Sequence, residues 1–132
     1  MQKISPLFIL LFFSSCVEHF EEKEVYGYYT PFDYKNNFDT LHLQPQGVYH
    51  RKVYDINKKL LLEMDGKWRL ENNHRIILSC FYFNLDDDLI KFPINVQDTT
   101  VGISTYFETH NGKIQFCGVG HHPDKNCYKK IK

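Results

Sequence analysis

The sequence has no excess of either charge. Its 132 residues include 16 Lys and Arg and 16 Asp and Glu, so the formal net charge at pH 7 is zero. Nucleic acids and anionic membrane surfaces attract proteins that carry concentrated positive charge. We therefore expect no nucleic acid among the partners of this chain.

Sequence motifs of catalysis are also missing. No serine stands in a Gly-x-Ser-x-Gly turn, no histidine in a His-Glu-x-x-His helix, and no glycine-rich loop is built to cradle phosphates. Catalytic carboxylates that meet only through folding would leave no such motif. We predict that the protein is not an enzyme and has no catalytic residue and no cofactor.

No apolar run is long enough to cross a membrane as a helix. The run Leu7–Phe13 has seven residues, whereas a transmembrane helix needs roughly 20. It follows a positive charge at Lys3 and precedes two small residues, Ser14 and Ser15. This order of charged, apolar and small segments is typical of a secretory signal peptide. We predict that residues 1–15 form that signal.

A cysteine follows this segment directly. Phe13-Ser14-Ser15-Cys16 resembles the lipobox of bacterial lipoproteins, in which the cysteine is acylated and becomes the first residue of the mature protein. The resemblance implies lipidation of Cys16 and an anchor in the bacterial cell envelope, at the outer membrane. Each buried CH₂ of an acyl chain contributes about 0.8 kcal/mol, so several chains hold a protein stably on a membrane.

The residues after the cysteine are acidic. Val17–Glu24 contains four glutamates and one lysine, and such local charge resists packing. We expect residues 16–24 to be a solvated tether and residues 25–132 to be a single domain. The acidic run also resembles the export signal of surface lipoproteins in Bacteroidetes, so the periplasmic and the surface face of the outer membrane both stay open.

Turn-forming residues recur at short intervals along the rest of the chain. Asp65-Gly66 and Asn111-Gly112 favour two-residue hairpin turns, because both central residues need positive φ. Asn72-Asn73 is a similar turn signal. The runs between the turns are rich in aromatic and β-branched residues, which favour strands. The predicted strands are Val25–Thr30, Asp39–Gln44, Val48–Ile56, Lys59–Met64, Lys67–Glu71, Arg75–Asn84, Leu89–Val96, Thr100–Thr109 and Lys113–Val119.

Short strands at this spacing indicate an all-β fold, an antiparallel up-and-down meander that forms a small barrel or half-barrel. One of the runs, residues 75–83, is apolar on both faces when read as a strand. Ile76 and Leu78 fall on one face, and Ile77 and Phe81 fall on the other. A second segment or a partner protein is needed to cover the outer face of such a strand.

Three local patterns occur in order along these strands, and together they are similar to the small lipocalin-like lipoproteins of Bacteroidetes over residues 25–119. The patterns are Gly27-Tyr28-Tyr29, then Asp39-Thr40-Leu41-His42-Leu43 followed by Gly47-Val48-Tyr49, then Gly66-Lys67-Trp68 leading into Ile76-Ile77-Leu78. The resemblance implies a calycin-type barrel of about eight strands, whose interior is filled by side chains or holds one small ligand.

Two functions follow from this reading of the sequence. The first is a membrane-anchored envelope lipoprotein that binds a small apolar ligand or an envelope component. The residues that would line its cavity are Tyr49, Trp68, Phe81 and Phe107, although aromatic side chains on an apolar strand face also form ordinary cores. The alternative is a tethered protein-interaction module, an inhibitor or immunity-like lipoprotein, and the two-sided run 75–83 favours it.

The cysteines other than Cys16 number three. Cysteines pair in an oxidising envelope compartment, and an odd count leaves one thiol over. A short turn region separates Cys117 and Cys127, so we predict a disulfide between them, with Cys80 left as a thiol.

The segment between the paired cysteines contains residue types that bind soft metals, namely His121, His122 and Asp124. Their spacing matches no zinc signature, and adjacent histidines point to opposite faces of an extended chain. We therefore predict a disulfide-closed loop and no metal site.

Overall fold

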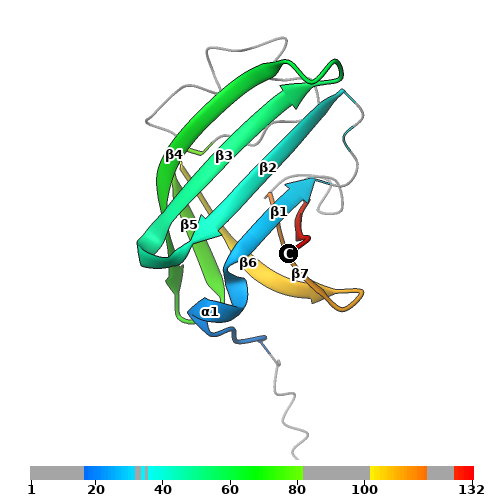
Figure 1. Ribbon diagram of the computed structural model, residues 1–132. Helices are drawn as coiled ribbons and strands as arrows, with labels where there is room; N and C mark the ends of the chain where they lie inside the picture. The colour runs from blue at the N-terminus through cyan, green and yellow to red at the C-terminus, as the bar shows by residue number, and fades with distance from the viewer. Residues whose placement is uncertain (1–16, 32–33, 35, 82–101, 119–126) are drawn as a thin grey trace, which may run out of the picture.

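The computed structural model describes residues 17–31, 34, 36–81, 102–118 and 127–132. In these ranges eight antiparallel strands follow one another in chain order and close into a barrel (Figure 1), because β8 pairs with β1 as well as with β7. The predicted up-and-down architecture is confirmed, and it is a full barrel. The elements are α1 (Glu22–Val25), β1 (Gly27–Pro31), β2 (Asn37–Gln44), η1 (Pro45–Gly47), β3 (Val48–Asp55), β4 (Leu60–Glu71), β5 (Arg75–Ser79), β6 (Gly102–His110), β7 (Lys113–Cys117) and β8 (Cys127–Lys130).

The two ends of the barrel are distinct. One end, here called the α1 end, carries α1 and the connections that follow β2, β4 and β6, and it is at the bottom of Figure 1. Two of its turns place Asn72, Asn73, Asn111 and Gly112 at φ between 51° and 77°. Asn and Gly tolerate this left-handed backbone better than other residues, so these predicted turns are confirmed. The opposite end, called the far end, includes the β3–β4 hairpin.

One predicted turn is wrong. The sequence predicts a hairpin at Asp65-Gly66, but β4 runs unbroken from Leu60 to Glu71 and merges two predicted strands. Gly66 pairs with Tyr49 of β3, whose ring occupies the space that a side chain at Gly66 would need. Glycine inside a strand marks such a close approach as often as it marks a turn. Gly66 therefore admits an aromatic ring and does not reverse the chain.

Over its described part, residues 75–81, the run 75–83 is not a continuous strand with two apolar faces. β5 ends at Ser79, and Cys80 adopts a positive φ of 55°. This conformation breaks the alternation of side chains, so Phe81 enters the same buried core as Leu78. The expectation that Phe81 shares a strand face with Ile77 is wrong for this reason, and Phe81 lies inside the barrel with the other aromatic residues proposed to point inward.

Closure of the barrel depends on a strand that the sequence did not predict. β8 is short and rich in lysine, and it pairs with β1 through Tyr29 and Lys130. On its other side Cys127 pairs with Cys117 of β7, and the two form the predicted disulfide. Cys80 stays a thiol and is half-buried. The predicted strand Leu89–Val96 lies outside the described residues.

The segment predicted to be a solvated tether is docked on the α1 end of the barrel. Phe20 is buried, and its backbone N–H donates to the carbonyl of Asn73 at 2.7 Å. Val25, at the end of α1, is also buried. The glutamates of the segment remain exposed, so its charge faces water while Phe20 packs against the barrel, and Val17 is exposed. Within the described ranges, no helix is long and apolar enough to span a membrane.

Candidate interaction face

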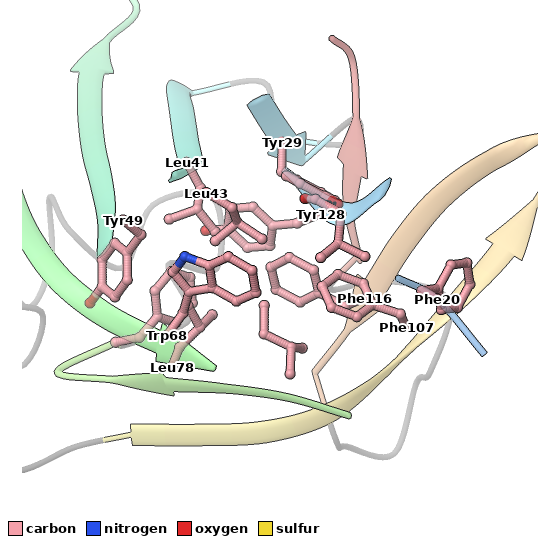
Figure 2. Packing of buried hydrophobic residues seen from close by; sticks show 13 residues of the cluster. Phe20, Tyr29, Leu41, Leu43, Tyr49, Trp68, Leu78, Phe107, Phe116 and Tyr128 are labelled. Carbon is pink, nitrogen blue, oxygen red and sulfur yellow. Dashed lines mark hydrogen bonds between the residues drawn. The ribbon is translucent and has the colours of Figure 1, made fainter. Parts of the chain in front are cut away.

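The barrel half next to α1 is filled by aromatic and aliphatic side chains. All four residues predicted to line a ligand cavity are buried in this one cluster. Figure 2 shows the rings of Tyr49, Trp68 and Phe107 entering the interior from β3, β4 and β6. Phe107 is nearly perpendicular to Phe116, with 5.8 Å between the ring centroids. The cluster comprises Phe20, Val25, Tyr29, Leu41, Leu43, Tyr49, Trp68, Ile76, Leu78, Phe81, Phe107, Phe116 and Tyr128.

Backbone carbonyls hold two of these four aromatic residues in place. The indole N–H of Trp68 donates to the carbonyls of Gln44 and Val48 at 2.9 and 3.0 Å. The hydroxyl of Tyr49 donates to the carbonyl of Ser79 at 2.6 Å, and burial raises its pKa to about 12. Buried Trp and Tyr need such partners for their polar atoms. Tyr49 and Trp68 are thus oriented as core residues and brace the barrel wall.

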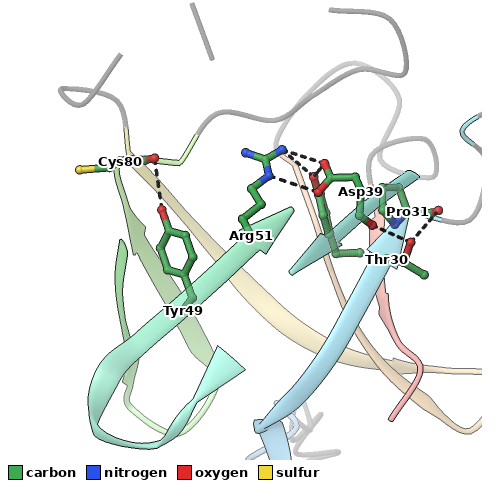
Figure 3. Close-up of polar contacts among 7 residues, drawn as sticks. Thr30, Pro31, Asp39, Tyr49, Arg51 and Cys80 are labelled. Atoms are coloured by element: carbon green, nitrogen blue, oxygen red, sulfur yellow. Dashed lines mark hydrogen bonds and ion pairs between the residues drawn. The ribbon is translucent and has the colours of Figure 1, made fainter. Parts of the chain in front are cut away.

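A buried ion pair lies beyond this cluster, toward the far end (Figure 3). Arg51 donates to both carboxylate oxygens of Asp39, from Nε at 3.2 Å and from Nη2 at 2.8 Å. The hydroxyl of Tyr128 donates to the same carboxylate at 2.5 Å, and the Arg51 guanidinium lies 4.4 Å from the centre of the Phe81 ring. Two opposite charges that share hydrogen bonds compensate each other inside the barrel.

The electrostatics of this pair follow from burial and proximity. Burial alone lowers the pKa of Arg51, but its interactions with Asp39, Tyr128 and Tyr49 together outweigh burial, and the pKa rises above its ordinary value. Burial raises the pKa of Tyr128 well above its ordinary value. The guanidinium is therefore charged and the phenol neutral at any physiological pH.

The sequence carried a signal for this pair. Asp39 shares a strand face with Leu41, and Arg51 shares one with Tyr49, so the two-residue period of a strand sends both charges inward. Because charged residues are rarely buried without a partner, the pattern could have been read as an internal ion pair.

Asn37 is a buried polar side chain at the far end. It is only 4% exposed, and among the described residues neither its amide nitrogen nor its amide oxygen has a hydrogen-bond partner. Asn37 is the first residue of β2, two positions before Asp39 on the same face. A buried polar group without a hydrogen bond costs about 1–3 kcal/mol. Asn37 is therefore not optimised for stability.

The outer wall formed by β1 to β4 carries a row of aromatic and charged side chains. Tyr28 stacks on His42 with the ring centroids 4.0 Å apart, and His42 pairs across the strands with His50. His50 contacts Asp65 at 2.6 Å and Glu63 at 3.3 Å. Desolvation, with the neighbouring His50, lowers the pKa of His42. Among the described residues, no three His, Cys, Asp or Glu side chains are arranged to hold a metal ion.

Closer to the far end the same wall is apolar. Phe38 pairs with Tyr54, and Tyr54 pairs with Leu60, in a row across β2, β3 and β4. Phe38 is 57% exposed, Leu60 44%, and Ile56 at the hairpin tip 63%. An open groove of about 310 Å³ lies on this surface, lined by Phe38, Tyr54 and Lys58. We call the set Phe38, Tyr54, Ile56 and Leu60 the outer patch.

The geometry of the β3–β4 hairpin produces this exposure. The carboxylate of Asp55 accepts from the backbone N–H of Asn57 at 2.8 Å and of Lys59 at 2.9 Å. Asp at the start of a turn often closes the loop in this way. A register shift at Val53/Tyr54 then leaves Tyr54 opposite Leu60. Such a bulge changes the direction of side chains. It lies at the corner of the barrel where Phe38, Ile56 and Leu60 are exposed.

Positive charge borders the outer patch. Lys58 lines the groove, and Lys59 next to it is exposed. Lys52 lies on the same outer wall, 3.7 Å from the carboxylate of Glu63. Lysine stems add apolar area while their ammonium groups stay in water. The surface therefore offers an apolar centre with a cationic border.

Comparisons of the chain with protein-family models, with curated proteins and with solved structures found no match. The proposed function therefore rests on the sequence and on the geometry of the barrel. Three of the predicted features lie outside the described residues, namely the lipidation site Cys16, the pair His121-His122 and Asp124.

Proposed function

We propose that this chain is an envelope lipoprotein, anchored through an acylated Cys16, that works as a tethered protein-interaction module. The outer patch carries the proposal, because a soluble domain rarely exposes several large apolar side chains at one corner without a binding role. Its partner is a protein that inserts an apolar side chain between Phe38 and Tyr54. The same partner places carboxylates next to Lys58.

The filling of the barrel also supports an external site. The four aromatic residues expected to line a cavity pack against other core residues, and two of them are hydrogen-bonded to the backbone. Small-molecule sites generally enclose most of the ligand in a concave pocket. An open groove on the outer wall encloses far less and suits the side chain of a protein partner.

The composition of the outer patch fits a protein interface. Interface centres are enriched in aromatic residues, and their rims are polar. Phe38 and Tyr54 are the aromatic members here, and Lys58 forms the polar edge. Attraction between lysines and carboxylates mainly increases the rate of association, so a partner would be steered to the patch and then held by apolar contacts.

Site-specific photocrosslinking tests this proposal in cells that make the protein. A benzophenone amino acid is placed at Phe38 in one variant and at Tyr106 in another. Tyr106 is the matched control, because it is an aromatic residue that is 52% exposed on β6, another strand of the barrel wall. We expect a protein crosslink from position 38 and none from position 106. Equal crosslinking at both positions, or none at either, would overturn the proposal.

Binding of the purified crosslinked partner gives the second test. A double variant, Phe38→Ser with Leu60→Ser, should weaken binding by at least about tenfold, because hot spots are central apolar anchors. Lys58→Glu should mainly slow association and reduce its dependence on salt. All three side chains are exposed, so thermal melting should change little. A dissociation constant that stays the same in the double variant contradicts the proposed site.

A second candidate function is favoured by one observation. The amide of Asn37, which has no hydrogen-bond partner among the residues that the structure describes, could be satisfied by a small polar ligand at the far end of the barrel. In this candidate function the protein still binds a small ligand, but the ligand lies beside Asn37 and not among the core aromatic residues. A bound small molecule that dissociates when Asn37→Leu is introduced would favour it over the interaction module.

A further inference from the structure

The N-terminal segment is fastened to the barrel by several contacts. The carboxylate of Glu18 accepts from the hydroxyl of Thr109 at 2.6 Å and from its backbone N–H at 3.3 Å. The ring of Phe20 packs edge-on against Phe107, with 6.0 Å between centroids. His19 also makes an edge contact with His74, at 6.0 Å. We call residues 18–25 the strap.

The second half of the strap is fastened as well. Glu24 caps the start of α1 by accepting from the backbone N–H of Glu21 at 2.7 Å, and the ammonium of Lys130 donates to the carbonyl of Glu24 at 2.7 Å. The carbonyl of the buried Val25 accepts from the hydroxyl of Tyr29 at 2.8 Å. The strap thus contacts β1, β6, β8 and the β4–β5 turn, which makes it part of the barrel end.

This docking leaves almost no free chain between the barrel and an anchor at Cys16. Only Val17 separates that cysteine from the fastened Glu18, and two residues span at most about 7 Å. An acyl chain on Cys16 begins in the membrane interface. We propose that the α1 end of the barrel is a membrane-contact surface, held against the bilayer in one orientation. This inference rests on the proposed anchor.

The orientation determines what the rest of the molecule faces. β4 runs from Leu60 in the outer patch to Glu71 at the α1 end, and its 12 residues cover about 36 Å of strand. The outer patch is consequently carried at the end away from the bilayer. At that distance from the bilayer, the outer patch is accessible to proteins in the aqueous compartment and does not contact the membrane that holds the anchor.

The negative charge of the strap indicates which headgroup charge a bilayer must have to contact this end of the barrel. Glu18, Glu21, Glu22 and Glu24 are exposed, and Lys23 is the only lysine among them. Anionic headgroups would repel this surface. The α1 end therefore suits a zwitterionic bilayer, in which the acyl chains provide the attraction and the strap provides the orientation.

Depth-dependent fluorescence quenching tests the orientation. The full-length acylated protein is reconstituted into phosphatidylcholine vesicles that contain a lipid with a headgroup nitroxide. A fluorescent amino acid replaces Lys23 in one sample and Lys58 in the other, since both lysines are exposed and lie at opposite ends of the barrel. We expect several-fold stronger quenching at position 23. Equal quenching at both positions in the acylated protein would overturn the inference.

A linker insertion serves as the control, because it leaves every strap contact in place. About ten Gly and Ser residues inserted between Val17 and Glu18 form a flexible chain, so quenching at positions 23 and 58 should become nearly equal. A difference that persists after the insertion would show that something other than the strap orients the barrel, and would also overturn the inference.

The mass of the purified protein separates this inference from the proposed anchor. A mass without acyl chains refutes the anchor, and the inference falls with it. An acylated protein with equal quenching at both positions refutes the fixed orientation alone.

Discussion

The two halves of the barrel interior differ in how they are filled. The half next to α1 is a continuous apolar cluster. The half toward the far end holds Asp39, Arg51 and Asn37, which has no hydrogen-bond partner in the described part of the chain, together with the small apolar pair Val53 and Leu62. Tyr128 joins the halves, because its ring stacks on Phe116 at 5.3 Å while its hydroxyl donates to Asp39. The α1 half gains stability from the burial of apolar surface. The half toward the far end can hold buried charges only because Asp39 and Arg51 are paired.

This difference shows that a filled barrel need not be uniformly apolar. Burial of apolar area stabilises the α1 half at roughly 25 cal/mol per Å². A buried ion pair gains little net stability, because desolvation offsets most of the attraction. We infer that the polar half fixes the arrangement of β2, β3 and β8, and with it the strands that carry the outer patch.

The largest effect is expected from breaking the ion pair. Arg51→Met leaves the Asp39 carboxylate buried without its cation and should lower the free energy of unfolding by about 3–5 kcal/mol. Chemical denaturation measures this change. The double variant Arg51→Met with Asp39→Leu should recover most of the loss, since no charge is then left unpaired. A loss below about 1 kcal/mol in the single variant would mean that Asp39 is not desolvated.

High pH should destabilise both halves. Burial raises the pKa of Tyr29, Tyr49 and Tyr128 above the ordinary value of 10, with that of Tyr49 at about 12. A raised folded-state pKa means that the folded protein binds these protons more tightly than the unfolded chain. Stability should therefore hold below pH 10 and fall from pH 10 toward pH 12 and above.

Denaturation at a series of pH values, with tyrosinate absorbance recorded in parallel, measures this effect. We expect tyrosinate absorbance of the buried phenols to appear together with unfolding. Titration of all tyrosines near pH 10 in a protein that stays folded would show that the three phenols are not buried.

A smaller effect is expected at Gly66, in the wall of the apolar half. Gly66→Ala places a methyl group where the Tyr49 ring lies and should cost about 2 kcal/mol through overpacking. Thermal melting of the variant measures the loss. The double variant Gly66→Ala with Tyr49→Leu should lose less than the two single changes together, because the clash is gone. A neutral Gly66→Ala would contradict this packing.

The smallest effect is a gain in the polar half. Asn37→Leu removes two buried polar atoms that lack partners within the described ranges, so it should raise the free energy of unfolding by about 1 kcal/mol. Asn37→Asp is the control, and it should be destabilising because it buries a charge near Asp39. A loss of stability in Asn37→Leu would mean that the amide of Asn37 is satisfied in solution.

Local sequence chemistry predicted much of the fold. The alternation around Leu41 and Leu43 and the turns at Asn72-Asn73 and Asn111-Gly112 led to the meander, and the Cys117–Cys127 pair was found from spacing and compartment. These features depend on neighbours within a few residues. They could be read from the chain because both the period of a strand and the φ of a turn are local properties.

Other features depend on contacts between distant segments. The role of Gly66 is set by Tyr49, and the burial of Phe20 depends on Phe107. Barrel closure by β8 needs β1, which is about a hundred residues earlier in the chain. No local pattern encodes such pairings. For the same reason the outer patch was missed, since Phe38, Tyr54 and Leu60 meet only across three strands.

The central claim is that the interior of the barrel is a core and that binding takes place on the outer wall. Native mass spectrometry of the full-length protein, extracted gently from its own membranes, tests this most directly by comparing the intact mass with the mass after denaturation. The account predicts an acylated protein that loses no small molecule on denaturation, whether or not a protein partner dissociates at the same time. Loss of a small-molecule adduct on denaturation would contradict it and would make the protein a ligand carrier.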